Sequence, residues 1–321
     1  MTIKAVFLLN LVLAITFNTA CAPAREAPTT TPAKSLTPLV LPESAELRHQ
    51  IEQIVGMTKG KVGVAAVLLG PNPPTTLVEL NADDHFPMQS VYKVPISMAV
   101  LDQIQNGKMK LDQKVQITKA DFIGRAAHSP IRDRHPNGVE LTIDELMRFA
   151  IGESDGTASD VLMKLAGGPK AIESYLRNLG VADMMVRNTE NEFSHDHSLQ
   201  YQNWTTPKAA TALLRALHER RALGEFHTSL LLQYMRNSTP GAKRLKGELP
   251  KDAIVAHKTG TSGTDKGVTA ATNDIGIITL PDGRSFAIAV FVSESPENLQ
   301  VREGVISGAA RAVWDYVKQN N

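Results

Sequence analysis

Apolar positions divide the chain into strand-like ends and a helix-like middle. The runs 61–69 and 75–80 are rich in Val and Leu and are separated by prolines, so they predict two paired strands. After Pro250, apolar runs return at 254–258, 270–280 and 285–293, with a Pro-Asp-Gly turn between the last two. These five segments predict the strands of one sheet.

The middle of the chain has the spacing of amphipathic helices. Apolar residues recur there every three to four positions, most clearly in segments 94–101, 143–151, 158–165, 171–179 and 208–218. Similar patterns lead into the first strand after Ser44 and close the chain at 297–318.

Strands at both ends and helices between them predict an α+β fold. We expect a five-stranded antiparallel sheet flanked by helices, with an all-α domain inserted after its second strand. The predicted boundaries place 44–88 and 237–321 in the sheet domain and 89–236 in the all-α domain. A small-molecule cleft is expected where the two parts meet.

The first residues have the pattern of an export signal. Lys4 precedes the apolar run 5–17, which is too short to span a bilayer, and small residues end the segment near Ala20. We therefore expect a signal peptide at 1–20 and a periplasmic protein. The Pro- and Thr-rich stretch 21–43 predicts a disordered linker.

Cys21 is the only cysteine of the chain, which excludes an intramolecular disulfide. Its position after small residues allows a lipid anchor, whereas Asn18 departs from the aliphatic residue that a lipidation signal prefers. Cleavage near Ala20 or Ala24 to a soluble product is the alternative.

Composition narrows the classes of partner. The 321 residues are 42% hydrophobic and 21% charged, with a net charge of +1, which gives no electrostatic basis for binding nucleic acid. We expect a monomer whose partner is a small molecule, and no cofactor.

A serine with a lysine three residues later is the first candidate for chemistry. Ser90 and Lys93 would share one face of a helix, so the lysine amine can reach the serine hydroxyl. A serine hydroxyl is a weak nucleophile without such a partner. One S-x-x-K alone recurs by chance, so it indicates a catalytic site only in combination with other motifs.

Two further motifs come later in the chain, in the order Ser154-Asp155-Gly156 and Lys258-Thr259-Gly260. Taken singly, Ser154 could be a helix N-cap and Lys258 a solvated strand lysine. In this order after Ser90, the three motifs indicate a serine acyl-transfer site.

Over nearly all of its folded length the chain resembles the class A serine β-lactamases, most closely the PER-type extended-spectrum subgroup. The resemblance implies that Ser90 attacks the β-lactam carbonyl and that the backbone N–H groups of Ser90 and Thr261 form the oxyanion hole. It implies that Ser154 relays a proton to the leaving nitrogen. It further implies a substrate-binding group made of Lys258, Thr259, Gly260, Thr261, Ser262 and Arg244.

Hydrolysis of an acyl-enzyme requires a general base that activates water. The resemblance places this base on an Ω-loop, where Glu190 is the predicted residue and Glu192 the alternative. A D,D-peptidase or penicillin-binding protein, which releases its acyl group slowly, is the alternative function.

Three positions depart from the family pattern. Gly156 replaces an asparagine that contacts substrate, Asn188 replaces an arginine that fastens the Ω-loop, and Ser194 stands where a second water-orienting residue is usual. These changes predict an atypical hydrolase with a more open loop.

Two other classes of protein are disfavoured. His195-Asp196-His197 is suggestive of a metallohydrolase, but a metal site needs three or four converging ligands, so we expect none. A binding or sensor module fused to a membrane receptor is disfavoured because no apolar run after the leader is long enough to span a membrane.

Overall fold

The computed structural model describes residues 44–70 and 75–320, which belong to one compact unit. The predicted signal peptide, the linker and Cys21 lie outside the described residues. The strands of the main sheet are β1 (Lys61–Leu69), β2 (Thr75–Leu80), β8 (Ile254–Thr261), β9 (Thr264–Asp265), β10 (Val268–Thr279) and β11 (Ser285–Ser295).

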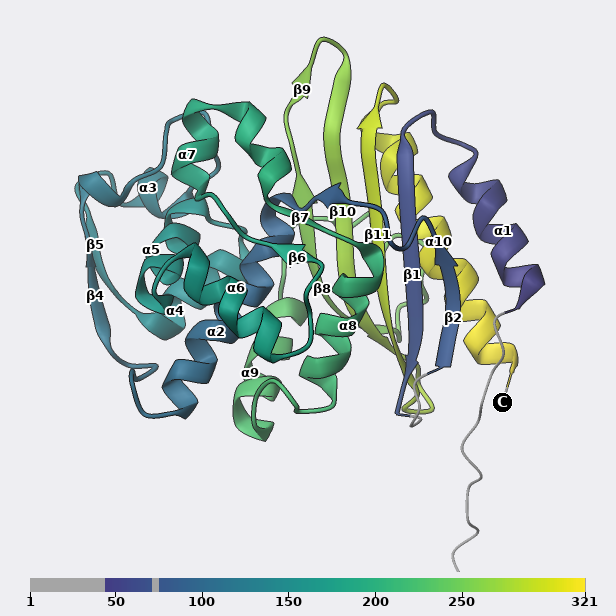
Figure 1. Ribbon diagram of the computed structural model, residues 1–321, viewed down its shortest axis with the longest axis horizontal. Coiled ribbons are helices and arrows are strands. Elements are labelled where there is room, and N and C mark those ends of the chain that lie inside the picture. The colour runs from purple at the N-terminus through teal and green to yellow at the C-terminus, as the bar shows by residue number, and fades with distance from the viewer. Residues whose placement is uncertain (1–43, 71–74, 321) are drawn as a thin grey trace, which may run out of the picture. The chain divides into compact units, whose positions relative to one another are not determined.

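The main sheet is antiparallel and joins both ends of the described chain (Figure 1). Its order is β2-β1-β11-β10-β8, and the short β9 pairs with β10. Val64 pairs with Val290 and Ile275 with Lys258, so the first strand and the last three lie side by side. The predicted fold class is therefore confirmed, with β9 as an addition.

Two apolar cores lie on opposite faces of this sheet. On one face, α1 and α10 cover residues such as Val290 and Ile288, and Trp314 of α10 is buried there. On the other face, α8 and the helical part cover Phe291 and Ala289. Strand β11 thus contributes side chains to both cores, because successive side chains of a strand point to opposite faces of the sheet.

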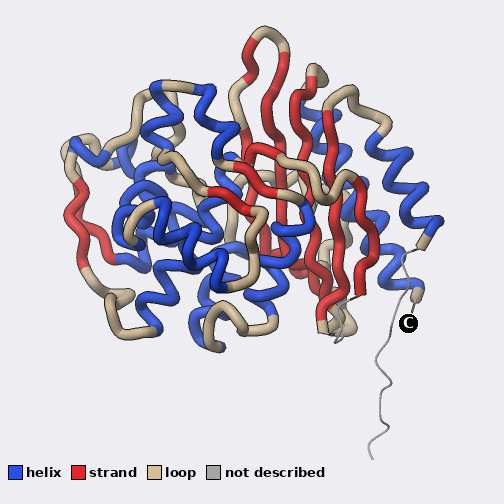
Figure 2. Tube along the Cα trace, viewed as in Figure 1, coloured by secondary structure: helices blue, strands red, loops and turns tan. Residues whose placement is uncertain are grey.

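The helices fill the middle of the chain and the two flanks, as Figure 2 shows in blue. The α-helices are α1 (Ala45–Val55), α2 (Lys93–Gln105), α3 (Pro130–Arg134), α4 (Ile143–Met147), α5 (Gly156–Ala166), α6 (Pro169–Asn178), α7 (Glu190–His195), α8 (Pro207–His218), α9 (Glu225–Arg236) and α10 (Leu299–Gln319). The 3₁₀ turns are η1 (Gln89–Tyr92), η2 (Lys119–Asp121) and η4 (His197–Gln202), and η3 (Arg148–Gly152) is a π-helix.

The structure departs from the sequence pattern mainly in the middle. The segment predicted as one helix over 143–151 is α4 followed by the π-turn η3, a rare element that is frequent near functional sites. Short strands that the helical spacing does not predict form two small sheets: β3 (Phe86–Pro87), β7 (Trp204–Thr205) and β6 (Met184–Met185), and β4 (Lys114–Ile117) with β5 (Val139–Thr142). The predicted boundaries of an all-α domain stay a prediction.

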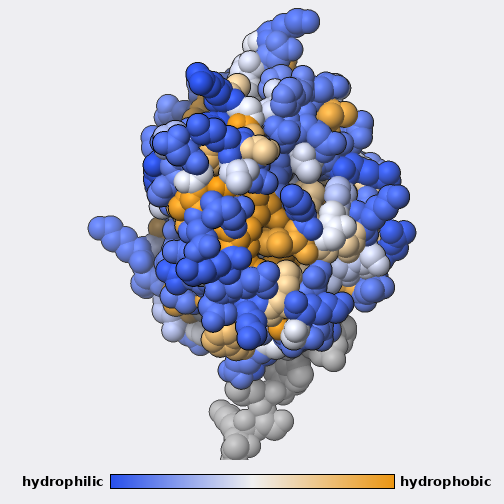
Figure 3. All heavy atoms as spheres, turned by 90° about the vertical axis from the view of Figure 1, so that its left-hand side faces the viewer, coloured by the Kyte–Doolittle hydropathy of each residue, from blue (hydrophilic) through white to orange (hydrophobic). Residues whose placement is uncertain are grey.

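The face formed by the helical part has apolar side chains near its centre and polar ones around them (Figure 3). Partly buried residues such as Leu111, Val115 and Val139 pack against the main core from this part of the chain. Within residues 44–70 and 75–320, no helix is both long and apolar enough to cross a bilayer.

Candidate active site

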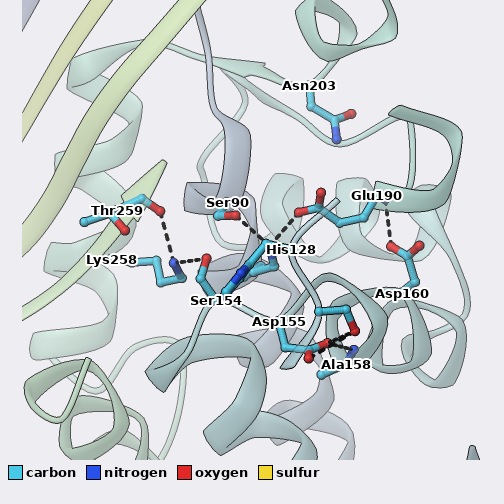
Figure 4. Close-up of polar contacts among 12 residues, drawn as sticks. Ser90, His128, Ser154, Asp155, Ala158, Asp160, Glu190, Asn203, Lys258 and Thr259 are labelled. Atoms are coloured by element: carbon cyan, nitrogen blue, oxygen red, sulfur yellow. Dashed lines mark hydrogen bonds and ion pairs between the residues drawn. The ribbon is translucent and has the colours of Figure 1, made fainter. Parts of the chain in front are cut away.

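Lys93 contacts both the predicted nucleophile, Ser90, and the predicted general base, Glu190. Ser90 lies in η1, and Lys93 is the first residue of α2, so both face the same side of one continuous helical segment. Lys93 Nζ lies 2.6 Å from Ser90 Oγ and 2.5 Å from Glu190 Oε1. Its side chain is 1% exposed and that of Glu190 is 16% exposed, so this ion pair is largely shielded from water. The dashed lines around Ser90 in Figure 4 mark these contacts.

The second motif meets the third on the opposite side of Ser90. Lys258 Nζ donates to Ser154 Oγ at 2.8 Å and to the carbonyl of Thr259 at 3.0 Å (Figure 4). Burial, followed by the positive charge of Lys93, holds the pKa of Lys258 well below its usual value. Ser154 therefore has a buried amine at hydrogen-bonding distance and is not the N-cap of α5.

That N-cap is Asp155. Its carboxylate accepts from the backbone N–H of Ala158 at 2.8 Å and of Ile131 at 2.7 Å, and Ser129 Oγ lies 3.2 Å away. Because these donors come from α3 and α5, Asp155 fixes the position of Ser154 next to it in the chain. The backbone of Ser154 has φ +62°, an uncommon left-handed conformation that only a well-fixed environment maintains.

Gly260 permits strand β8 to approach the segment that carries Ser90. A methyl group on Gly260 would clash with the carbonyl oxygen of Met88 and lie 3.1 Å from Gln89 Cβ. Gln89 itself has φ +49°, so the backbone just before Ser90 is also in the left-handed region. The glycine of the Lys-Thr-Gly motif is therefore required by packing, because no larger residue fits there.

Asp160 of α5 holds the helix that begins with Glu190. One of its carboxylate oxygens accepts from the backbone N–H of Glu190 at 2.8 Å (Figure 4). The other accepts from the backbone N–H of Asn191 at 2.9 Å. Burial, with a smaller contribution from the charge of Glu190, raises the pKa of Asp160 to about 7. Sequence patterns offer little signal for this residue, which is a partly buried acid on a mostly buried helix.

An amide network closes the loop around Glu190 where the family pattern has an arginine. Asn203 is fully buried, and its Oδ1 accepts from the backbone N–H groups of Arg187 at 2.6 Å and of Asn188 at 2.9 Å. The side chain of Asn188 donates to the carbonyl of Leu199 at 3.3 Å and lies 3.2 Å from Gln202 Oε1. The loop expected to be more open is thus closed by neutral hydrogen bonds.

Glu192, the alternative base, and Ser194, another departure from the family pattern, form hydrogen bonds within their own helix and its N-cap. Glu192 accepts from the backbone and side chain of Thr189 at 2.8 and 2.9 Å, forming the capping box of α7. Ser194 Oγ donates to the carbonyl of Asn191 at 2.6 Å. Of the two glutamates considered, Glu190 is the one that contacts Lys93.

Arg244 lies under strand β8 and is 5% exposed. Its Nη1 donates to the carbonyls of Gly260 at 3.0 Å and Asn273 at 2.9 Å, and its Nε lies 3.3 Å from Glu303 Oε1. The side chain is therefore a buried brace of the strand, and a direct two-bond grip on a substrate carboxylate remains a prediction.

These groups surround a cleft of about 460 Å³. The predicted site residues that line it are Ser90, Lys93, Ser154, Glu190, Thr259, Thr261 and Ser262. The other three, Lys258, Gly260 and Arg244, lie behind its wall. The lining residues that the sequence did not single out for the cleft include Gln89, Gln200, Phe193, His197 and Pro240. His128 also lines the cleft and bonds to the carbonyl of Glu153 at 2.9 Å.

Metal ligation finds no support in the described ranges. No cluster of three or more His, Cys, Asp or Glu side chains suited to a metal ion occurs in 44–70 and 75–320. His195 Nδ1 bonds to the carbonyl of Asn191 at 2.7 Å, and Asp196 accepts from Ser198 at 2.6 Å. The His-Asp-His segment therefore has local partners.

Comparisons with known proteins indicate one family. The model of the β-lactamase enzyme family matches residues 46–317. β-Lactamase VEB-1 of Pseudomonas aeruginosa is 40% identical over 85% of this chain and 91% of its own length. The extended-spectrum β-lactamase PER-1 of the same organism is 38% identical over 85% of this chain and 88% of its own length.

A solved structure gives the same result. The β-lactamase from Chitinophaga pinensis is 43% identical, with a TM-score of 0.81 over 85% of this chain and 99% of that one. The chain therefore belongs to the β-lactamase enzyme family, as a class A member. The family predicted from the three motifs is confirmed, and the protein is a hydrolase of β-lactams.

Proposed function

We propose that this protein opens penicillins and cephalosporins through a covalent ester on Ser90, which water activated by Glu190 then cleaves. The observation that carries the proposal is the shared contact of Lys93 with Ser90 Oγ and Glu190 Oε1, at 2.6 and 2.5 Å. A group that bonds to both can move a proton between them, so the nucleophile and the base belong to one hydrogen-bonded chain.

In the first half of the reaction, Ser90 Oγ attacks the lactam carbonyl and gives its proton to the Lys93–Glu190 pair. The carbonyl oxygen becomes an oxyanion held by the N–H groups of Ser90 and Thr261, each worth about 2.7–4 kcal/mol in such sites. As the C–N bond breaks, Ser154 gives a proton to the lactam nitrogen. Lys258, 2.8 Å from Ser154 Oγ, replaces that proton and is then reprotonated from solvent. The Lys93–Glu190 pair releases the proton of Ser90 to solvent, so Glu190 is ionised again before the second half.

In the second half, Glu190 removes a proton from water, and the resulting hydroxide attacks the ester carbonyl. As the bond to Ser90 Oγ breaks, Glu190 returns the proton to Oγ through Lys93. This role requires the carboxylate to stay beside Ser90 after acylation. Three contacts support it: the ion pair with Lys93, and the two backbone hydrogen bonds that Asp160 accepts at the start of α7.

The substrate carboxylate would lie against the end of β8. Thr259, Thr261 and Ser262 line the cleft there and offer hydroxyl groups. Lys258 and Arg244 lie behind these residues, and their positive charges would attract the substrate carboxylate across the strand. Because β-lactam antibiotics act outside the cytoplasm, we further propose export to the periplasm by segment 1–20 and a role in resistance.

The test is intact-protein mass spectrometry during turnover of a penicillin. The wild-type protein should show a short-lived adduct of the drug's full mass, mapped to the peptide that contains Ser90, followed by free enzyme. The Ser90→Ala variant should form no adduct and lose about 10³-fold or more in kcat, as removal of a catalytic serine typically does.

An adduct in the wild type that persists for hours would support the slow D,D-peptidase alternative. An adduct on another residue, or full turnover by Ser90→Ala, would contradict the proposal. Circular dichroism of the variant serves as the control for folding.

A further inference from the structure

Gly156 is crowded by two side chains that are distant from it in the sequence. A methyl group on Gly156 would overlap Ile123 Cδ1 and would lie 3.2 Å from both Cβ and Cγ of Glu190. Ile123 is 2% exposed, so its side chain is a fixed part of the interior. Ile123 and the methylene groups of Glu190 therefore flank the same point, which a side chain at 156 would otherwise occupy.

The loop that carries Ile123 is held from two sides. Arg132 donates to the carbonyls of Ile123 at 3.2 Å, Gly124 at 2.6 Å and Ala127 at 3.0 Å. The backbone N–H of Ile123 points to Thr157 Oγ1 at 3.4 Å, in the residue after Gly156. Arg132 is only 15% exposed, so these bonds are sheltered and the loop has little freedom to retreat.

The same loop meets helix α7 at a second point. A methyl group on Gly124 would lie 2.7 Å from Ser194 Oγ, four residues after Glu190. The loop thus faces the first turn of α7 across Gly156, and it approaches the end of α7 at Gly124. Asp160 and Lys93 hold Glu190 by polar contacts, whereas Ile123 and Gly156 form an apolar wall on the side of its methylene groups.

We propose that Ile123 is a positioning residue for Glu190, and that Gly156 and Ile123 form a matched pair. Ile123 Cδ1 takes the place of a side chain at position 156 and limits the conformations open to the Glu190 side chain. The carboxylate then stays at Lys93 Nζ, which is where deacylation needs it. The inference deepens the proposed function, because it assumes that Glu190 is the base.

The chain offers an atom-for-atom test. Ile123→Val removes Cδ1, and Gly156→Ala adds a methyl group at nearly the same place. Either change alone disturbs the wall beside Glu190, so we expect deacylation of a penicillin to slow by about threefold in Ile123→Val and about tenfold in Gly156→Ala. In the double variant the two changes compensate, and deacylation should return to within about twofold of wild type.

The readouts separate positioning from folding. Pre-steady-state kinetics gives separate rate constants for acylation and deacylation. Acylation should slow less than deacylation in both single variants, because Ser90 and Lys93 are not displaced. Two control variants carry the same types of substitution at other positions. Ile51→Val lies on the other face of the sheet, and Gly304→Ala lies on α10, where a methyl group meets open space. Both should leave deacylation unchanged, although Ile51→Val lowers the Tm.

Losses that multiply in the double variant, or deacylation at the wild-type rate in both single variants, would overturn the inference. So would equal slowing of acylation and deacylation, which indicates a general structural effect. A Glu190→Gln variant in the same series distinguishes failure of the proposed function from failure of this inference. If it turns over normally, the proposed function fails, and if it stalls as an acyl-enzyme while the pair shows no coupling, only this inference fails.

Discussion

The guanidinium of Arg244 lies beneath Thr261 and donates to its hydroxyl at 2.7 Å. Thr261 is exposed at the end of β8, whereas Arg244 is buried behind it. We therefore expect a substrate in the cleft to meet the threonine hydroxyl, which the arginine orients and polarises. In this arrangement, the positive charge would act on a substrate carboxylate through Thr261.

The first prediction concerns this pair. Thr261→Val removes the hydroxyl but keeps the shape, so KM for penicillins should rise by about 5–10-fold while kcat stays within about twofold. Arg244→Ala removes this contact and also the support of β8, so it should raise KM at least as much. The double variant should be no worse than Arg244→Ala, since the contact between Arg244 and Thr261 is already lost in the single variant. Steady-state kinetics of the three variants is the measurement. Multiplying effects in the double variant would show that Arg244 reaches substrate directly.

The second prediction concerns Asn203. Besides accepting two N–H groups, its side chain donates from Nδ2 to the carbonyl of Asn188 at 2.8 Å. Asn203→Ala leaves these buried backbone groups without partners, so the free energy of unfolding should fall by about 2–4 kcal/mol. Urea denaturation measures the change, and Asn106→Ala, which removes an exposed amide at the end of α2, is the control. A loss as small as that of the control would show that the amide does not hold the loop.

The third prediction is a pH dependence that comes from Asp160. Because the folded protein raises the pKa of this carboxyl to about 7, the folded state binds more protons than the unfolded state between about pH 4 and pH 7. Stability should therefore fall as the pH rises through this window. Asp160→Asn carries no such charge, so its stability relative to wild type should improve with rising pH, by about 1.4 kcal/mol per unit of pKa shift.

Denaturation curves of wild type and Asp160→Asn at pH 5 and pH 8 measure this effect. The lost hydrogen-bond acceptor adds a constant difference that does not vary with pH. Asp133→Asn, which removes an exposed carboxylate on α3, is the control for the loss of one surface charge. A constant difference between wild type and Asp160→Asn at all pH values would contradict the prediction.

The fourth prediction concerns the glycine of the third motif. Gly260→Ala forces β8 away from Met88, because the added methyl group would clash with a backbone oxygen that cannot rotate away. This shift would move the backbone N–H of Thr261 away from that of Ser90, and these two groups form the predicted oxyanion hole. We therefore expect kcat/KM to fall by about 10²-fold or more. Gly263→Ala, which adds a methyl group in open space on the same side of the cleft, is the control. Similar activity of the two variants would contradict the role of close packing at this position.

The sheet was predictable because its signals are local. The bounds of β1 and β2 agree with the predicted 61–69 and 75–80, since apolar runs bounded by turn residues fix a strand over a few positions. β8 runs on to Thr261, past the predicted end at Lys258, because its last residues pair with β10 in spite of their polar side chains. Such pairing depends on a partner that the local pattern does not show.

The site was predictable only as far as short motifs reach. The motifs located Ser90, Ser154 and Lys258, whose roles stay predictions. The resemblance pointed to Glu190, and the structure brings its carboxylate to Lys93. Ile123 and Asp160 carried no signal, because an isoleucine in a loop and an acid on a helix are ordinary residues. The roles proposed for them rest on the approach of segments about 30 residues apart, which depends on the path of the chain in three dimensions.

The most direct test of the mechanism compares Glu190→Gln with Glu192→Gln by mass spectrometry of the quenched reaction. The two substitutions are chemically identical and two residues apart, but only Glu190 contacts Lys93. We expect the Glu190→Gln protein to accumulate the penicillin ester on Ser90, with a deacylation rate lowered about 10²–10⁴-fold, while the Glu192→Gln protein returns to free enzyme. Free enzyme in both cases, or an ester that builds up only when Glu192 is replaced, would contradict the assignment of Glu190 as the base.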